Sequence, residues 1–292
     1  MERFSVVRRG LDARRKGGVV RVYAVEVSLC APALEEAVCS RVGAAKAVPP
    51  PPDPFQAPRA RKTSVRPVGV GAGPAGLFAA WTLARFGAPP VLLERGRPVE
   101  ERSRDVAVFW KSGELDPESN VQFGEGGAGT FSDGKLTTRI GDPLVSRVIG
   151  LFEEFAELPG LRVEAKPHVG TDRLKGFCRR MREELVSLGA EIRFGARVDE
   201  VTAGEGRGRG GRLAGGEEIP CGELVLAVGH SARDTMRMLL SRGVKLSAKA
   251  FAVGFRVEHP LALIDRIQYG RVAGRSDLPP ADYRLAARAP SG

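Results

Sequence analysis

Six residues with glycine at the first, third and sixth positions could hold a phosphate group. They are Gly71, Ala72, Gly73, Pro74, Ala75 and Gly76. The first glycine allows a tight turn, the second lets the backbone approach a pyrophosphate, and the third lets a helix pack closely on a strand. The helix that follows would offer free N–H groups and partial positive charge to an anion. Glycine is common here, 37 of 292 residues, so the surroundings of the motif decide its meaning.

An acidic residue follows at the distance that this motif requires. Glu94 lies about twenty residues after Gly71, where its carboxylate could accept hydrogen bonds from an adenosine ribose. Its charge would also repel a 2′-phosphate, so FAD or NAD fits this site and NADP does not. Arg95 and Arg102 come next, in an arrangement similar to the arginine pair that brackets the adenosine and pyrophosphate in flavoproteins. The alternative is that these arginines form a solvated charge run.

A second glycine-rich stretch runs from Val121 to Leu136. Its glycines repeat the same spacing, but no buried strand precedes them and the Ser132–Gly134 turn prevents a helix. We therefore reject a second dinucleotide motif and favour a loop whose backbone packs against a flat ligand, with a merely flexible loop as the alternative. The candidate ligand contacts in this loop are Gly126, Gly127, Ala128, Gly129 and Thr130.

A late apolar strand, Leu224–Val228, ends in small residues. It resembles the late "ATG" element of flavoproteins with two dinucleotide-binding domains, where the backbone passes against the cofactor; a plain core strand is the alternative. Ala227 and Gly229 are the candidate contacts, and His230 beside them is a candidate for a cofactor-side role, although a structural role is slightly favoured. No catalytic acid, base or nucleophile can be named, and the three histidines have no metal-ligand spacing.

Alternating strands and helices are expected to position these residues. A first unit contains a strand at Val68–Val70, a helix at residues 74–86 and a strand at Val91–Leu93. A second contains a helix at residues 172–188, a strand at Glu191–Phe194, a β-meander at Val198–Gly222, the late strand, and a helix at Ser231–Leu240 that begins with Ser231 and Asp234 in a capping box. This order predicts an α/β fold, a Rossmann-like FAD-binding domain with a mostly parallel sheet and a β-meander.

Four segments are expected along the chain. Residues 1–48 form a small basic α+β appendage, with a strand at Arg21–Leu29 and a helix at Leu34–Val42. Residues 49–64 are a Pro-rich linker, since four consecutive prolines fix the backbone and remove N–H donors. Residues 65–245 are the FAD-binding domain, and residues 246–292, with a strand at Phe251–Val257, begin an incomplete substrate domain.

Composition excludes several classes of protein. Lys and Arg total 45 against 35 Asp and Glu, a net charge of +10, but residues 1–64 hold 12 basic and 6 acidic side chains, or +6, so the larger part is nearly balanced. This distribution and an aromatic content of 6% argue against nucleic acid as the partner. The four cysteines form no CxxC pair, so neither a disulfide scaffold nor a zinc site is expected. Without a membrane span or a secretory signal, a cytoplasmic location is expected; an organelle transit peptide is the alternative.

From about Pro67 to Tyr283 the chain resembles the uncharacterised FAD-dependent dehydrogenase family, NAD(P)/FAD-dependent oxidoreductases related to the glutathione-reductase-type flavoproteins. The strings that carry the resemblance are GAGPAGLFAA, LLERGRPVEERSRDV, LDPESNVQFGEGGAGTFSDGKLTTRI, KPHVGTD, LAVGHSARDT and FAVGFRVEHP. The N-terminal appendage is similar as well. The resemblance implies an FAD fold with the flavin near Gly126–Thr130 and a discontinuous substrate domain.

The same resemblance implies an FAD-dependent oxidoreductase or dehydrogenase, in which hydride or electron pairs pass through the flavin and NAD is a possible electron donor. Its substrate and redox partner are unknown. Members of such families close the FAD site with a C-terminal glycine-rich segment, which does not appear before Gly292, so a C-terminally truncated chain is expected. Two alternatives stay open: a non-catalytic fragment of such a flavoprotein, and a flavoprotein acting on RNA, suggested by the basic N-terminal fifth.

Overall fold

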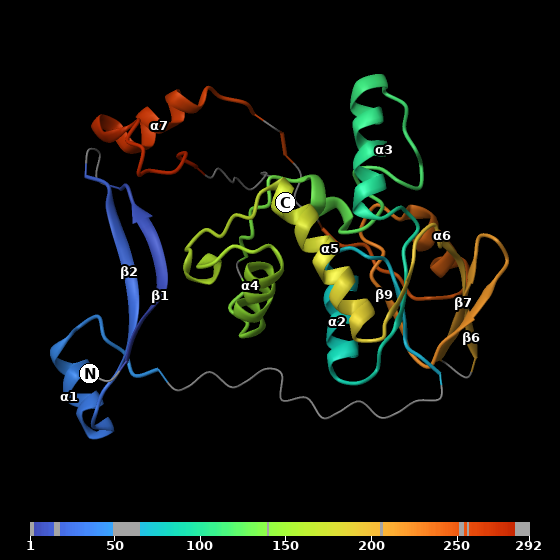
Figure 1. Cartoon of the computed structure of the whole chain (residues 1–292), viewed down its shortest axis with the longest axis horizontal. Coiled ribbons are helices and arrows are strands. Elements are labelled where there is room, and N and C mark those ends of the chain that lie inside the picture. The colour runs from blue at the N-terminus through green and yellow to red at the C-terminus, as the bar shows by residue number, and fades with distance from the viewer. Residues whose placement is uncertain are drawn as a thin grey trace. The chain divides into compact units, whose positions relative to one another are not determined.

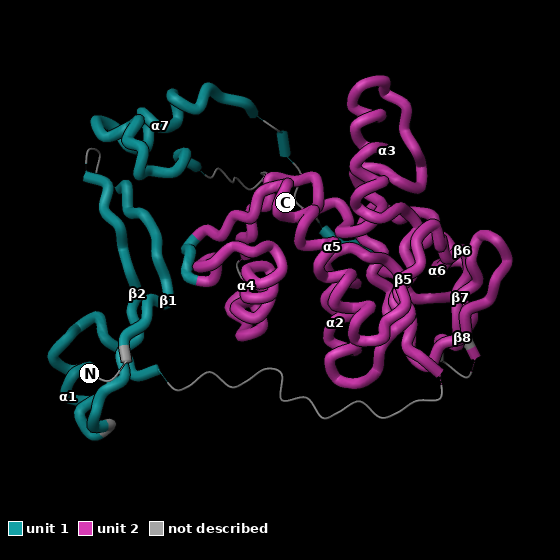
Figure 2. The backbone as a smooth tube through the Cα atoms, in the orientation of Figure 1, with its two compact units in different colours: residues 1–48, 163–165, 248–292 teal, residues 49–162, 166–247 magenta. Residues whose placement is uncertain are grey.

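The computed structural model describes residues 3–14, 18–48, 65–138, 140–204, 207–250, 254–255 and 257–283. The chain divides into two compact units, coloured separately in Figure 2. Unit 1 contains residues 1–48, 163–165 and 248–292, and unit 2 contains residues 49–162 and 166–247. The expected Pro-rich linker, residues 49–64, lies outside the described residues, and the expected four-part domain division stays a prediction.

Unit 2 is built on a parallel sheet of four short strands. These are β3 (Val68–Val70), β4 (Val91–Leu93), β5 (Glu191–Arg193) and β9 (Leu224–Leu226), in the spatial order β5-β4-β3-β9. Val68 pairs with Val91 on one side and Leu224 on the other. The first strand in sequence thus lies between the second and the fourth, which is the Rossmann arrangement. The expected Rossmann-like α/β fold is confirmed.

One face of the sheet is covered by helices, visible in Figure 1. They include α2 (Pro74–Arg85), α4 (Leu144–Phe155) and α5 (Thr171–Ser187), whose apolar side chains form a core with Leu92 of β4. Phe152 of α4 and Phe177 of α5 stack with their ring centroids 4.4 Å apart. Gly69 faces the same side, where a Cβ would lie 3.0 Å from Leu92 Cδ1, so close packing accounts for a glycine inside this strand.

The opposite face packs against an antiparallel meander of β6 (Val198–Gly204), β7 (Arg207–Leu213) and β8 (Glu218–Pro220), as expected from the alternating pattern. Val68, Val70, Val91 and Leu93 are buried in this second core. Because side chains alternate along a strand, β4 contributes Leu92 to the first core and Val91 and Leu93 to the second. The sheet is therefore held from both faces, and its carboxyl ends lie between the two cores.

Two expectations in the C-terminal part of the chain differ from the structure. Helix α6 (Arg233–Ser241) begins after Ala232 and has no side-chain cap, so the capping box is wrong. Ser231 Oγ instead donates to Gln122 Oε1 at 3.0 Å, and Asp234 binds Arg95. The strand expected at Phe251–Val257 lies partly outside the described residues; those described there have no strand.

Unit 1 contains an antiparallel hairpin of β1 (Arg3–Asp12) and β2 (Val20–Ser28), then α1 (Glu35–Arg41), and further along the chain α7 (Leu261–Tyr269). The strand and helix expected in the appendage are present, but β1 was not predicted. Residues 163–165 join this unit because Glu164 bridges Arg9 through its backbone and its side chain. Arg21 donates to the Asp277 carbonyl at 2.8 Å, which connects the hairpin to the segment after α7.

The remaining elements are helix α3 (Val99–Ser112) and 3₁₀ turns at Pro32–Leu34, Gly127–Phe131, Leu161–Val163 and Gly270–Val272. Among the described residues, no helix is long and apolar enough to cross a membrane.

Candidate functional site

A cavity of about 370 Å³ lies at the carboxyl ends of β3 and β9 in unit 2. At this point the chain leaves β3 toward β4 on one side and returns as β9 on the other. Ligands of open parallel sheets bind at such a switch point. The predicted site residues that line the cavity are Gly71, Gly73, Pro74, Ala75, Glu94, Arg95, Gly127, Ala128, Gly129, Ala227 and Gly229.

Two positions of the turn after β3 require glycine. Gly71 has a φ of +101°, and a Cβ there would lie 2.4 Å from the Ala227 carbonyl oxygen. A Cβ on Gly76 would lie 1.8 Å from the Gly71 carbonyl oxygen. The first and third glycines therefore allow β9 and α2 to approach the turn closely.

The N-terminus of α2 opens on the cavity. Gly73 is its N-cap, Pro74 occupies the first turn, and no acidic residue lies in that turn. The Leu77 N–H donates to the Gly73 carbonyl at 2.9 Å, so the N–H groups of Ala75 and Gly76 precede this helical hydrogen bond. An anion held there would meet N–H donors and the positive end of the helix dipole.

The glycine loop lies directly against this turn. The Gly126 N–H donates to the Ala72 carbonyl at 2.8 Å. A Cβ on Gly127 would lie 3.0 Å from Gly73 Cα, so the two backbones are in contact. Gly126 and Thr130 lie behind the cavity wall; the Thr130 hydroxyl donates to the Glu125 carbonyl at 3.3 Å.

Glu94 lines the cavity but uses its carboxylate mainly on the backbone. The residue is 4% exposed. Its Oε2 accepts the Ala72 N–H at 2.7 Å, and its Oε1 accepts those of Gly96 at 2.9 Å and Gly124 at 3.0 Å. A carboxylate has about four acceptor positions, so three are already used. The sequence predicted that Glu94 binds an adenosine ribose and predicted none of these backbone partners.

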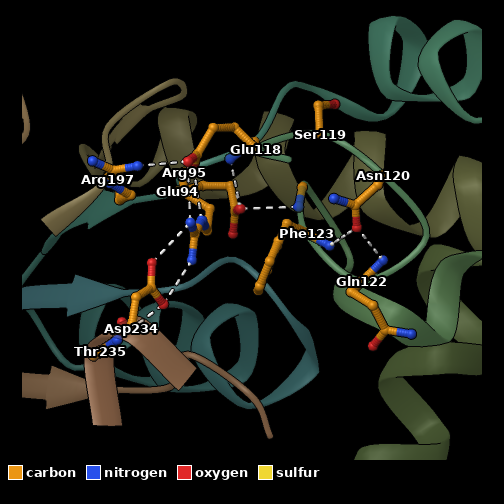
Figure 3. A network of polar contacts seen from close by, with 12 residues as sticks. Glu94, Arg95, Glu118, Ser119, Asn120, Gln122, Phe123, Arg197, Asp234 and Thr235 are labelled. Carbon is orange, nitrogen blue, oxygen red and sulfur yellow. Dashed lines mark hydrogen bonds and ion pairs between the residues drawn. The ribbon is translucent and has the colours of Figure 1, made fainter. Parts of the chain in front are cut away.

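Arg95 belongs to a network of charges at the Glu94 end of the cavity (Figure 3). Its Nε donates to Glu118 at 2.8 Å, another nitrogen lies 3.0 Å from Asp234, and its guanidinium stacks over the Phe123 ring at 4.1 Å. Arg197 also donates to Glu118 at 2.6 Å. Burial alone would raise the pKa of Glu118, but the hydrogen bonds from both arginines hold the pKa below its usual value.

Arg102 occupies a different position from the one expected. It is fully buried and does not line the cavity. Its Nε donates to the Asn120 carbonyl at 2.8 Å and its Nη1 to the Glu125 carbonyl at 2.6 Å, so it holds the glycine loop from behind. Burial lowers the pKa of the guanidinium to about 10. Only Arg95 of the expected arginine pair lies at the cavity.

The other predicted site residues do not line the cavity and lie behind its wall: Ala72, Gly76, Arg102, Gly126 and Thr130. The structure adds lining residues that the sequence did not single out, Gln122, Phe123, Gly124, Ala196, Arg197, Ser231 and Met236. Three of them lie in the glycine-rich string, where their position was a usable signal; Ala196 and Arg197 follow β5 without any recognisable motif. His230 also lines the cavity. No cluster of metal-ligating side chains occurs in the part of the chain that the structure describes.

Comparison with known families finds one match, in the C-terminal segment. Residues 250–292 match the family "FAD-dependent protein, C-terminal domain-like". This segment carries the signature of FAD-dependent proteins. The match confirms the family resemblance inferred from the sequence. It also supports FAD as the cofactor.

A curated relative extends over nearly the whole chain. An uncharacterised protein of Clostridium beijerinckii is 42% identical over 293 residues, which are 98% of this chain and 53% of that protein. The chain therefore spans about half the length of this relative.

Several solved structures share a lower similarity with this chain. The THI4 protein of Thermovibrio ammonificans is 17% identical, with a TM-score of 0.41 over 62% of this chain and 64% of that one. Thioredoxin reductase of Lactococcus lactis is 18% identical, with a TM-score of 0.32 over 56% and 35%. A ferredoxin reductase of Rhodopseudomonas palustris is 15% identical, with a TM-score of 0.28 over 60% and 26%.

Proposed function

We propose that this chain binds FAD in the cavity of unit 2 and serves an oxidoreductase that passes hydride or an electron pair between a donor and an acceptor. The observation that carries the proposal is the contact between the dinucleotide turn and the glycine loop, Gly126 N–H to Ala72 carbonyl, directly behind one wall of the cavity. FAD supplies the two-electron chemistry, and the protein supplies position and polarity. NAD is proposed as an electron donor.

Charge balance assigns the pyrophosphate to the helix. Arg95 already binds Glu118 and Asp234, so it does not bring a free positive charge to the cavity. The N–H groups of Ala75 and Gly76 and the dipole of α2 remain as the anion-binding groups. In this proposal the adenosine lies toward Glu94, and the flavin lies toward Gly127–Gly129.

Titration of the purified chain with FAD tests the proposal, with quenching of flavin fluorescence as the measurement. Gly73→Ala is the informative variant, because Gly73 lines the cavity, lies outside the positive-φ region and would place its methyl group 3.7 Å from Gly127 Cα. The chain should therefore fold, while FAD affinity falls by about tenfold or more, the effect of losing one well-made anion contact.

The matched control is Gly141→Ala, whose added methyl group meets nothing within 4 Å and which does not line the cavity. Its FAD affinity should equal that of the unaltered chain. Absence of any FAD binding by the unaltered chain, or equal binding by both variants, would contradict the proposed site.

A further inference from the structure

Two segments that lie far apart in the sequence share one buried carboxylate. Glu94 at the end of β4 accepts an N–H from the dinucleotide turn, at Ala72, and another from the glycine loop, at Gly124. The two bonds end on different oxygens, 2.7 Å from Oε2 and 3.0 Å from Oε1. Because the residue is 4% exposed, water competes little for these bonds and their strength is retained.

Further contacts fix the same arrangement. The Ala72 N–H is bound by Glu94, and the Ala72 carbonyl accepts the Gly126 N–H at 2.8 Å, so both polar groups of this peptide are used. A Cβ on Gly96 would lie 2.6 Å from Gly124 Cα, which shows how closely the β4 exit approaches the loop. The turn and the loop are therefore joined directly, by the Gly126–Ala72 hydrogen bond, and also through the Glu94 carboxylate, which binds one N–H group of each.

We propose that Glu94 is the positioning residue that couples the dinucleotide turn to the glycine loop, so that a ligand spanning both segments is bound more tightly than the two contacts alone would give. The proposal rests on the proposed function, because FAD is the ligand taken to span both. Preorganisation of this kind strengthens binding by removing the cost of ordering a loop. ADP carries the adenosine and pyrophosphate but no flavin, so it reaches the turn alone.

Glu94→Gln separates coupling from ribose recognition. An amide has one acceptor oxygen, so it can serve the turn or the loop but not both. We expect FAD to lose about 5- to 150-fold more affinity than ADP, the usual range of coupling between two sites. The control is Glu101→Gln, an exposed position on α3 that should leave both affinities unchanged.

Equal losses for FAD and ADP would overturn the coupling. If Glu94→Gln also erased a difference between ADP and 2′-deoxy-ADP seen in the unaltered chain, Glu94 would be a ribose ligand alone. A general loss of fold would lower both affinities alike and would be detected by circular dichroism.

Hydrogen exchange in the ligand-free chain gives a second, independent measurement. We expect the Ala72, Gly96 and Gly124 amides to lose protection together in Glu94→Gln, by about tenfold or more. Unchanged protection of the Gly124 amide would overturn the coupling. If the unaltered chain bound neither FAD nor ADP, the proposed function would fail, while the exchange result would still decide the role of Glu94.

Discussion

A buried arginine and a buried carboxylate bind opposite polar groups of the glycine-loop backbone. Glu94 accepts N–H groups, whereas Arg102 donates to carbonyl groups, at Asn120 and Glu125. Gly124 has a φ of +117°, and a Cβ there would lie 2.4 Å from Arg102 Cδ. Glycine at this position is therefore required both by the backbone conformation and by the arginine that passes beneath it.

Arg102→Met tests whether the hydrogen bonds from Arg102 to the loop carbonyls stabilise the fold. Methionine fills a similar volume but removes the Arg102 donor from the Asn120 carbonyl and leaves the Glu125 carbonyl with the Thr130 hydroxyl alone. An unsatisfied buried carbonyl costs about 1–3 kcal/mol. We expect the free energy of unfolding, measured by urea denaturation, to fall by about 2 kcal/mol or more. Arg104→Met, at an exposed position of the same helix, should change it by about 0.5 kcal/mol or less. Equal stabilities of the two variants would contradict the role of Arg102.

At the scale of elements, Glu118 joins parts of unit 2 that are distant in sequence. It binds Arg95 after β4 and Arg197 before β6, and Arg95 in turn binds Asp234 in α6 (Figure 3). These bonds hold the β4 exit, the meander and α6 around one end of the cavity. Their effect on stability depends on the ionisation of Glu118, whose pKa is lowered in the folded chain.

The pH dependence follows from the sign of that shift. A carboxyl whose folded pKa is lowered contributes stability above its unfolded pKa, about 4.3, and loses it as the pH falls through the folded value. Glu118→Gln should therefore destabilise the chain by about 1 kcal/mol at neutral pH, a modest amount because Glu118 is partly exposed. The difference should shrink as the pH falls below the unfolded pKa and through the lowered folded pKa of Glu118. Urea denaturation at a series of pH values measures it; a difference independent of pH would exclude the ionic contribution.

Several elements that local pattern determines were predicted, whereas helices α3, α4 and α7 were not. Short apolar runs predicted β3 and β4, and a single apolar stripe predicted α5. Both patterns are local, because a buried strand or helix face places apolar residues at regular short spacings. The meander followed from alternation and glycine. In contrast, β1 was missed, because it carries Arg8 and Arg9 and lies in an exposed hairpin without a buried face.

The candidate site divides in the same way. The glycine turn was predicted because its geometry requires glycine within six residues. The capping box failed because Ser231 and Asp234 bind Gln122 and Arg95, partners that no local pattern reveals. Arg102 was wrongly predicted to contact the ligand for the same reason. Its carbonyl partners lie about twenty residues away along the chain, and only the folded loop turns those carbonyl groups toward it.

At the scale of the whole molecule, the ligand cavity and the basic N-terminal segment belong to different units. Every residue that lines the cavity, from Val70 to Met236, lies in unit 2. Residues 1–48 lie in unit 1, together with residues 248–292, which contain the whole of the match to the FAD-dependent family model. The Arg21–Asp277 contact joins the hairpin to that C-terminal segment.

Deleting residues 1–48 tests this division. Because no lining residue is removed, FAD affinity should stay within about twofold of the full chain, a difference well below the tenfold that each 1.4 kcal/mol would produce. The removed hairpin exposes apolar side chains, among them Phe4 at 56% and Val22 at 51%, so its loss should not lower solubility. Fluorescence titration of both chains with FAD, with circular dichroism as the check on folding, measures the outcome. A folded deletion variant that had lost FAD would show that the cavity of unit 2 depends on unit 1 for binding.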